Sequence, residues 1–373
     1  MKRQIGLLFW LMCVVSVLCV AAEKKGDVLQ LTLPPTFYAA PGVEISIYYD
    51  NIVLTEKPED YRFTVDCKIG KAEERRWTVT PRPKDHGDHP VSVTVADSKG
   101  KTLAKGKTTL HVAKADAGAG KTLRLLIVGD SLTNATVYPK EIGRLLSEPA
   151  NPQWIMFGTN RRGGPDEKVG HEGYGGWTWQ LFTSHYEPNP DKANKKFSSP
   201  FIFVKDGKPE LDVPEYFKEH CGGTRPDIVT FLLGINDCFS ANPDDVDAID
   251  KRVDDMFKPA ERLIEEFQKA APKADLGICL TTPPNSRESG FEANYKGRYH
   301  RWGWKRIQHR LVQRQIEHFD GQESKHIFIV PTELNLDPVD GYPDNNGVHP
   351  NPIGYQQIGA SIYAWIKWRL EER

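Results

Sequence analysis

The spacing of apolar residues changes part-way along the chain. Between residues 27 and 113, apolar side chains alternate with polar ones in short segments separated by turn-forming residues such as Pro41-Gly42. A period of two is that of a strand with one buried face, and several such segments without a long helical stretch indicate an antiparallel β-sandwich. We therefore predict a small all-β sandwich domain over residues 27–113, with strands at 29–33, 43–48, 61–65, 91–95 and 108–112.

From residue 122 onward, strand and helix patterns alternate. Continuous apolar runs predict buried strands at 123–128, 154–157, 228–233, 276–280 and 326–330. Helical spacing predicts helices at 139–147, 244–269, 304–319 and 352–368, the last with one apolar side packed on the sheet. This alternation is typical of a mostly parallel sheet with helices on both faces. The second domain is expected to span residues 122–373.

Two segments are expected to lie outside these folded domains. Residues 114–121, Lys-Ala-Asp-Ala-Gly-Ala-Gly-Lys, are small and glycine-rich and predict a flexible linker. At the start of the chain, Lys2 and Arg3 precede an apolar run at 5–20 and then Ala21-Ala22. This order predicts a secretory signal peptide at residues 1–22, and hence a secreted or periplasmic protein. An uncleaved membrane anchor is the alternative, but the run is short for a membrane span.

Charge and cysteine usage exclude several classes of function. The formal net charge is −1 at pH 7, so there is no basic excess for nucleic acid to bind. No segment after the signal peptide is apolar enough to enter a membrane. The four later cysteines have no metal-site spacing, and one disulfide or buried thiols are both compatible with them. We expect neither a metal nor an organic cofactor, and the oligomeric state is left open.

Four polar or glycine-rich segments carry the candidate chemistry. Three lie at the ends of predicted strands or in glycine-dense loops: Gly129-Asp130-Ser131-Leu132, residues 171–178 and residues 232–237, Leu-Leu-Gly-Ile-Asn-Asp. The fourth, residues 346–351, precedes the last helix. A serine after a parallel strand lies at the sheet edge where open α/β folds bind ligands. The alternative is that Asp130 and Ser131 only cap a helix.

Together, the four segments resemble the blocks of the SGNH (GDSL-like) hydrolase superfamily, named for its serine, glycine, asparagine and histidine. The resemblance covers residue 122 to the C-terminus and implies a flavodoxin-like three-layer α/β sandwich and a serine esterase. It makes Ser131 the nucleophile and His349 the base that takes its proton. The oxyanion hole would comprise the N–H groups of Ser131 and Gly176 and the side-chain amide of Asn236.

One position departs from the superfamily pattern. The aspartate usually found three residues before the histidine is replaced by Asn346. An amide can hold the imidazole by a hydrogen bond, but it supplies no charge and can favour the wrong tautomer. Asp344 is the candidate orienting residue, and a Ser131–His349 dyad is the alternative. A catalytically weak relic of an active site is also compatible with this change.

The expected substrate follows from the residues around these segments. Tyr174, Trp177 and Asp237 are predicted to contact substrate, and aromatic rings beside polar groups suit sugars. Other aromatic residues near the same edge either border the crevice or belong to the core: Trp179, Tyr295, Tyr299, Trp302 and Trp304. Residues 281–288 either contact substrate or form a plain loop.

The leading hypothesis is an exported carboxylic ester hydrolase, an acetylesterase acting on acetylated polysaccharides or oligosaccharides. It is similar to carbohydrate esterases of the superfamily, and no long apolar lid of the kind a lipase needs is found. The alternatives are an SGNH lipase or esterase acting on lipid or small-molecule esters, and a catalytically weak glycan-binding protein.

Overall fold

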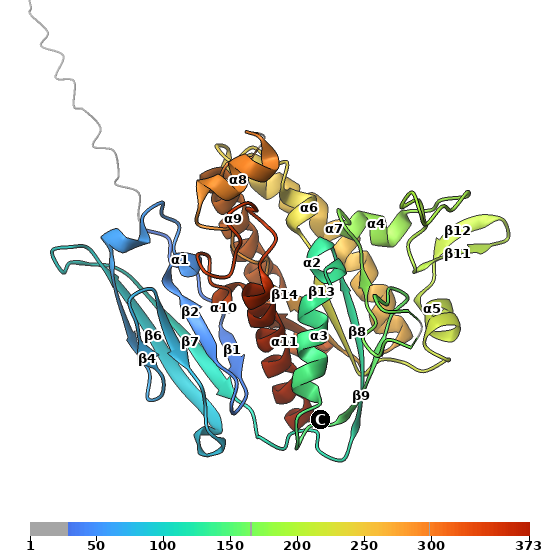
Figure 1. Ribbon diagram of the computed structural model, residues 1–373, viewed down its shortest axis with the longest axis horizontal. Helices are drawn as coiled ribbons and strands as arrows, with labels where there is room; N and C mark the ends of the chain where they lie inside the picture. The colour runs from blue at the N-terminus through green and yellow to red at the C-terminus, as the bar shows by residue number, and fades with distance from the viewer. Residues whose placement is uncertain (1–28, 165, 298) are drawn as a thin grey trace, which may run out of the picture.

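The computed structural model describes residues 29–164, 166–297 and 299–373. The predicted signal peptide, residues 1–22, lies outside these ranges. Figure 1 shows a β-rich N-terminal part beside a larger α/β part. None of the described helices combines the length and apolar character that a membrane span requires. The four described cysteines, Cys67, Cys221, Cys238 and Cys279, are free thiols.

The larger part contains a parallel sheet built around one central strand. That strand, β8 (Thr122–Gly129), pairs on one side with β9 and β10 and on the other with β13, followed by β14 and β15. The partner strands are β9 (Gln153–Phe157), β10 (Glu172–Gly173), β13 (Ile228–Leu232), β14 (Asp275–Cys279) and β15 (Ile327–Val330). Every ladder in this sheet is parallel, which confirms the predicted flavodoxin-like α/β class. The register places Leu232 beside Gly129, so β8 and β13 end side by side.

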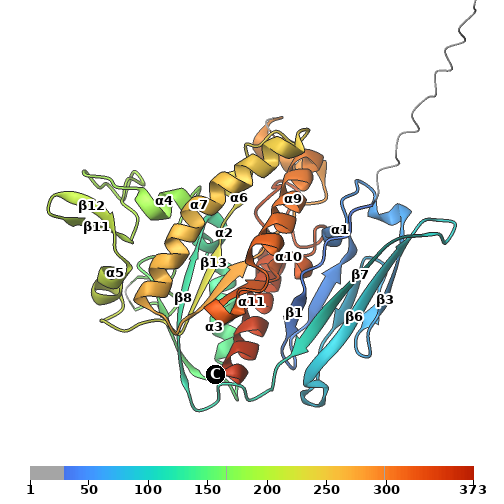
Figure 2. The ribbon, with the colours of Figure 1, turned by 180° about the vertical axis from the view of Figure 1, so that it is seen from behind.

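Long helices cover both faces of this sheet. In Figures 1 and 2, α3 and α11 lie on one face and α7 and α9 on the other. Their bounds confirm the four predicted helices to within a few residues: α3 (Val137–Leu146), α7 (Val246–Ala270), α9 (Arg301–Phe319) and α11 (Pro352–Glu372). Helix α11 begins where the sequence indicates, because Asn351 accepts a hydrogen bond from the Gly354 N–H at 3.1 Å and Pro352 occupies the first turn.

Short elements that the sequence pattern did not predict fill the connections. They are α2 (Ser131–Asn134), α4 (Trp179–Ser184), α5 (Val213–His220), α6 (Ile235–Cys238), α8 (Glu288–Tyr295), α10 (Thr332–Asn335), and a hairpin of β11 (Ile202–Lys205) and β12 (Lys208–Leu211). Most are too short to show a period of their own. Two of them, α2 and α6, follow directly after β8 and β13 and carry residues of the site.

The N-terminal part has two sheets. One has the order β1 (Thr36–Ala39), β7 (Thr102–Val112), β6 (Gly87–Ala96), β3 (Arg62–Asp66), and the other the order β2 (Ile45–Tyr48), β5 (Arg76–Val79), β4 (Lys71–Ala72). The rings of Phe37 and Trp77, one from each sheet, meet with centroids 6.1 Å apart. Two details of the prediction are wrong. β1 pairs with β7 in parallel, and the strand expected at 29–33 is a single bridge at Leu31.

Helix α11 is buried on both sides, which the prediction of one apolar side did not anticipate. Its Trp365 packs on the sheet, where a Cβ on Gly277 would lie 2.7 Å from the indole. On its opposite side Trp368 stacks on Tyr38 of β1, with ring centroids 4.9 Å apart. The helix therefore lies between the two parts of the molecule and joins their cores (Figure 1).

The segment 114–121 is held in place, contrary to the prediction of a flexible linker. The Lys367 ammonium, on α11, donates to the Ala115 carbonyl at 3.0 Å and to the Ala117 carbonyl at 2.7 Å. Burial lowers the pKa of Lys367 to about 8. A buried ammonium requires acceptors, and the turns of this segment supply them.

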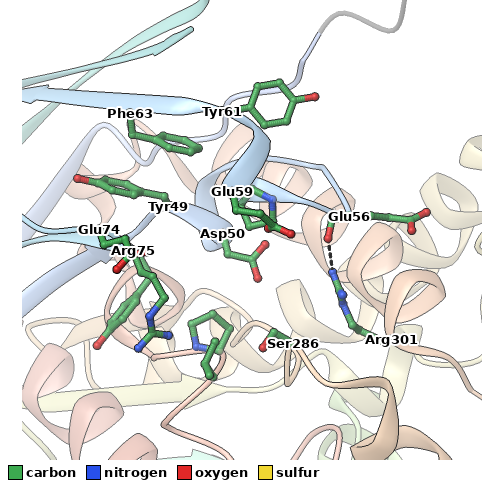
Figure 3. A pocket seen from close by; sticks show the side chains of 14 residues that line it. Tyr49, Asp50, Glu56, Glu59, Tyr61, Phe63, Glu74, Arg75, Ser286 and Arg301 are labelled. Carbon is green, nitrogen blue, oxygen red and sulfur yellow. Dashed lines mark hydrogen bonds between the residues drawn. The ribbon is translucent and has the colours of Figure 1, made fainter. Parts of the chain in front are cut away.

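Polar contacts between the two parts support the loop that follows β15. The Ser46 N–H donates to Asn335 at 2.7 Å, Asn51 donates to the Leu336 carbonyl at 2.8 Å, and Arg75 pairs with Asp337 at 3.0 Å. A cavity of about 500 Å³ also lies between the parts, with Arg75 and Arg301 on its wall (Figure 3). The N-terminal part thus helps to fix the residues that lead into the segment containing His349.

Candidate active site

Ser131 is the first residue of α2, directly after the central strand. The turn is tight, because a Cβ on Gly129 would lie 1.9 Å from the Thr133 hydroxyl oxygen and 2.9 Å from the Leu232 carbonyl oxygen. Asp130 caps the helix, its carboxylate accepting from the Leu132 N–H at 2.9 Å. Capping is therefore performed by Asp130, and the Ser131 hydroxyl is left for another partner.

That partner is His349. The imidazole Nε2 lies 2.9 Å from Ser131 Oγ, although the two residues are 218 positions apart in the chain. This distance is within the hydrogen-bond range required between a nucleophile and its base. The first and fourth segments thus meet at the carboxyl end of β8.

Asn346 sets the orientation of the imidazole. Its Oδ1 accepts from the backbone N–H groups of Val348 at 3.0 Å and His349 at 2.9 Å, and lies 3.2 Å from His349 Nδ1. Two backbone donors can face only the oxygen of an amide, so the nitrogen of this side chain is turned away. The imidazole therefore carries its hydrogen on Nδ1, and the Nε2 lone pair faces the Ser131 hydroxyl. This is the tautomer that a general base requires.

Asp344 does not have the position expected of an orienting residue. Its side chain is 88% exposed, and its carboxylate lies 3.5 Å from Arg287 Nε. The described contacts of the imidazole include Asn346 but not Asp344. The backbone donors of residues 348 and 349 draw Asn346 inward, whereas Asp344 remains in the exposed part of the loop.

The electrostatics around His349 follow from this arrangement. Burial lowers the pKa of His349 below its usual 6.5, and no other cause contributes. A carboxylate beside Nδ1 would raise the pKa of His349 again, whereas the neutral amide of Asn346 does not. The imidazole is therefore mainly neutral, and able to accept a proton, at neutral pH.

Donors for an oxyanion border the same space. Asn236, on α6, donates from Nδ2 to the Trp177 carbonyl at 3.0 Å and makes a long contact of 3.4 Å to Asp130. Among the described residues, the N–H groups of Ser131 and Gly176 have no acceptor. Gly176 has φ +79°, and a Cβ there would meet open space. Three donors are thus placed around the nucleophile.

These residues line one cavity of about 510 Å³. Its wall comprises Ser131, Gly176, Ile235, Asn236, Phe239, Asn294, Tyr295, Tyr299, Val348 and His349. Tyr295 and Tyr299 were among the aromatic residues expected near the crevice, whereas Phe239, whose ring packs against both, was missed. Trp304 packs beneath Phe239, with centroids 4.6 Å apart, and Trp179 packs against Phe231 at 5.2 Å, so both are core residues.

The three predicted substrate contacts do not line this catalytic cavity. Tyr174 and Trp177 line a separate cavity next to it. Asp237 lies below the surface, where its Oδ1 accepts from the Trp179 N–H at 3.2 Å. Burial raises the pKa of both Asp237 and Asp130 to about 7. Asp237 thus anchors the start of α4 and does not face the catalytic cavity.

Asn285 is a supporting residue that sequence reasoning missed. Its side chain, fully buried, donates to the carbonyls of Pro343 at 2.9 Å and Asn346 at 3.0 Å, and its N–H donates to Gly347 at 3.0 Å. The loop at 281–288 therefore holds the segment containing His349. Nothing in the sequence distinguishes this asparagine from one in a plain loop.

The described residues contain no group of three or more histidine, cysteine, aspartate or glutamate side chains able to hold a metal ion. The groups that the site brings together are a serine hydroxyl, an imidazole and hydrogen-bond donors.

Comparison with solved structures finds several proteins to which the chain is similar. The chain is similar to a carbohydrate esterase family 3 protein from Talaromyces cellulolyticus, with 16% identity over 67% of this chain and 99% of that chain and a TM-score of 0.40. It is also similar to a family two carbohydrate esterase from Clostridium thermocellum, with 14% identity over 89% of this chain and 94% of that chain and a TM-score of 0.38. A third similar structure is Est24, a carbohydrate acetylesterase from Sinorhizobium meliloti, with 13% identity over 65% of this chain and 98% of that chain and a TM-score of 0.39.

No curated protein matches the chain. A family sequence profile, however, matches residues 127–357, a range that includes all four segments and more than half of the chain. On this match, the protein belongs to the GDSL-like Lipase/Acylhydrolase family of SGNH hydrolases.

Proposed function

We propose that this protein is an exported serine esterase that removes acetyl groups from polysaccharides or oligosaccharides. The observation that carries the proposal is the 2.9 Å contact between Ser131 Oγ and His349 Nε2 at a cavity also lined by Gly176 and Asn236. Nucleophile, base and oxyanion donors are the three requirements of acyl transfer. Export rests on the leader-like residues 1–22 alone.

The reaction would begin with attack by Ser131 Oγ on the ester carbonyl carbon while His349 Nε2 takes the hydroxyl proton. The oxyanion would be bound by the N–H groups of Ser131 and Gly176 and by Asn236 Nδ2. One hydrogen of that amide is held by the Trp177 carbonyl, and the other makes only the 3.4 Å contact to Asp130. This second hydrogen is the one that would turn to the oxyanion.

Collapse of the tetrahedral intermediate would expel the sugar alcohol, which takes its proton from His349, and leave an acetyl group on Ser131. Water would then attack the acyl-enzyme, with His349 again as base, and acetate would leave. The imidazolium formed in each step would be stabilised by the Asn346 carbonyl oxygen, 3.2 Å away, through a dipole without a full charge.

The walls of the cavity favour a sugar over a lipid. Phe239, Tyr295 and Tyr299 present aromatic rings beside the amides of Asn236 and Asn294, a mixture that suits a ring with both apolar faces and hydroxyl groups. Within the described part of the chain, none of the exposed large apolar residues lines this cavity: Ile155, Tyr186, Val204, Val246 and Ile353. An enzyme that works at a lipid surface needs a contiguous apolar patch.

The test is hydrolysis of p-nitrophenyl acetate by the wild-type protein and by Ser131→Ala, with circular dichroism as the control for folding. Loss of nearly all turnover in a folded Ser131→Ala variant is expected. A variant that retains wild-type turnover would refute the proposal. Acetate release from acetylated polysaccharides should exceed turnover of long-chain acyl esters. The reverse order would indicate the lipid esterase, and glycan binding without any hydrolysis would indicate a catalytically weak glycan-binding protein.

A further inference from the structure

A second cavity lies beside the catalytic one. It has a volume of about 560 Å³, and we call it the Tyr174 cavity. Its lining residues are Asn134, Thr159, Asn160, Arg162, Tyr174, Gly175, Trp177, Lys192, Lys195, Phe197, Ser198, Pro200 and His220. Most of them come from the loops after β9 and β10 and from the segment before β11, whereas Asn134 ends α2 and His220 ends α5.

The chemistry of this wall is one-sided. It contains three cationic side chains, Arg162, Lys192 and Lys195, and no aspartate or glutamate. Among the residues that the structure describes, none of these three cations has a carboxylate partner. Figure 3 shows a mixed wall in the cavity between the two parts of the molecule, where Asp50, Glu56, Glu59 and Glu74 occur together with Arg75 and Arg301. An anion is therefore favoured in the Tyr174 cavity specifically.

The aromatic wall of the Tyr174 cavity is rigid. Tyr174 packs against Trp177 and Phe197, with ring centroids 4.7 Å and 5.0 Å apart. Behind it, fully buried Glu172 accepts hydrogen bonds from the hydroxyls of Tyr174 and Tyr216 and from Thr159. This carboxylate is enclosed by its donors and does not line the cavity. It fixes the Tyr174 ring, which can then hold a sugar face without losing side-chain freedom.

Two connections place the Tyr174 cavity next to the nucleophile. Ser131 begins the four-residue helix α2, and Asn134, which lines the Tyr174 cavity, ends it. Residues three apart on a helix have Cβ atoms roughly 5–6 Å from each other. In the glycine-rich loop, Gly175 lines the Tyr174 cavity and Gly176 lines the catalytic one. A glycan whose ester lies at Ser131 can therefore extend into the Tyr174 cavity.

We propose that the Tyr174 cavity binds an anionic group, a carboxylate or a sulfate, on the same glycan chain whose acetyl ester reacts at Ser131. This inference rests on the proposed esterase function and narrows its substrate to acidic glycans, either uronic acid-containing or sulfated. Arg162, Lys192 and Lys195 would bind the anion, and Tyr174 and Trp177 would pack against the sugar ring that carries it.

The experiment measures KM for two forms of acetylated homogalacturonan. In one form the carboxylates are free, and in the other they are methyl-esterified, which removes the charge and keeps the backbone. KM should be lower for the charged polymer, and the difference should shrink as ionic strength rises from 0.01 M to 0.5 M. An acetylated sulfated glycan tests the second source of the anion. A preference for either charged polymer supports the proposal and identifies the group.

Lys195→Gln and Lys196→Gln form a matched pair, because both lysines are exposed in one loop and only Lys195 lines the cavity. Lys195→Gln should raise KM for the charged polymer by up to about fivefold, the value of one exposed charge pair. Neutralising Arg162, Lys192 and Lys195 together should raise KM for the charged polymer more than about tenfold. The control variant Lys196→Gln should change this KM less than twofold. Turnover of p-nitrophenyl acetate should be unchanged in all of them.

Equal KM values for the charged and esterified homogalacturonans, together with no preference for the sulfated glycan, would overturn the proposal. So would a triple variant whose KM for the preferred charged polymer is unchanged. So would a triple variant that also loses p-nitrophenyl acetate turnover, since its residues would then serve the catalytic cavity or the fold. Failure of the esterase function itself is distinguishable, because it would appear as p-nitrophenyl acetate hydrolysis that survives Ser131→Ala.

Discussion

Replacing Asn346 by aspartate adds one negative charge beside the imidazole and preserves the shape of the loop. An aspartate oxygen can accept the same two backbone hydrogen bonds, from Val348 and His349, that Asn346 accepts at 3.0 and 2.9 Å. The distance to His349 Nδ1 is 3.2 Å. At this distance a charge would stabilise the imidazolium by about 5 kcal/mol at an effective dielectric constant of about 20.

Part of that stabilisation is already present, because the Asn346 carbonyl dipole faces Nδ1 and water reaches the partly buried site. We therefore expect Asn346→Asp to raise kcat for p-nitrophenyl acetate by about 10- to 10³-fold. The gain should stay below the roughly 10⁴-fold loss seen when a triad aspartate becomes asparagine, since much of that loss reflects a wrong tautomer. Here the tautomer is already correct.

The assay is a full pH profile of kcat and kcat/KM for the wild type, Asn346→Asp and Asp344→Asn. The aspartate variant should also move the acidic limb of kcat/KM to higher pH, because a carboxylate raises the pKa of the adjacent imidazole. Asp344→Asn should change neither rate nor profile, since its side chain is 88% exposed. A folded Asn346→Asp variant with an unchanged rate and profile would refute the assignment of Asn346 as the residue that orients His349.

Three further predictions concern the oxyanion hole, the pH profile and the N-terminal part. Asn236→Ala should lower kcat by about 10²–10³-fold with the fold intact by circular dichroism, and a loss below threefold would remove Asn236 from the oxyanion hole. Because burial lowers the pKa of His349 from 6.5, and the base acts when neutral, the acidic limb of wild-type kcat/KM should lie below pH 6.5; a limb at pH 7 or above contradicts this. A chain that begins at residue 114 should be insoluble, because removing β1 exposes the side of α11 that stacks on Tyr38; a soluble, fully active fragment would show that the N-terminal part is dispensable.

The α/β part of the fold could be predicted because its signals are local and strong. Its strands are continuous apolar runs, and Asn351 and Pro352 mark the start of α11 by the chemistry of a helix cap. The second buried side of α11 could not be predicted in this way. That side is buried because β1 covers it. A contact between two segments far apart in the chain produces no hydrophobic periodicity in the sequence of either segment.

The site was predictable to a similar extent. Ser131, Asn236 and His349 could be assigned together because the four segments resemble the blocks of the SGNH superfamily. The segments of Ser131 and Asn236 follow strands, and such segments meet at one edge of a parallel sheet. The orienting residue could not be assigned, because the inward position of Asn346 depends on the conformation of the loop at residues 346–349. Likewise, the sequence could not show that Tyr174 and Trp177 line a cavity beside the catalytic one, since a glycine-rich loop can direct neighbouring residues to different sides.

The central claim is that Ser131 is a nucleophile activated by His349, and covalent trapping tests it most directly. The protein would be treated with a fluorophosphonate and the modified residue located by peptide mass spectrometry, with His349→Ala as the comparison. A single adduct on Ser131, formed far more slowly in His349→Ala, is predicted. A folded, esterase-active protein that carries the adduct elsewhere, or that labels Ser131 equally fast without His349, would contradict the claim.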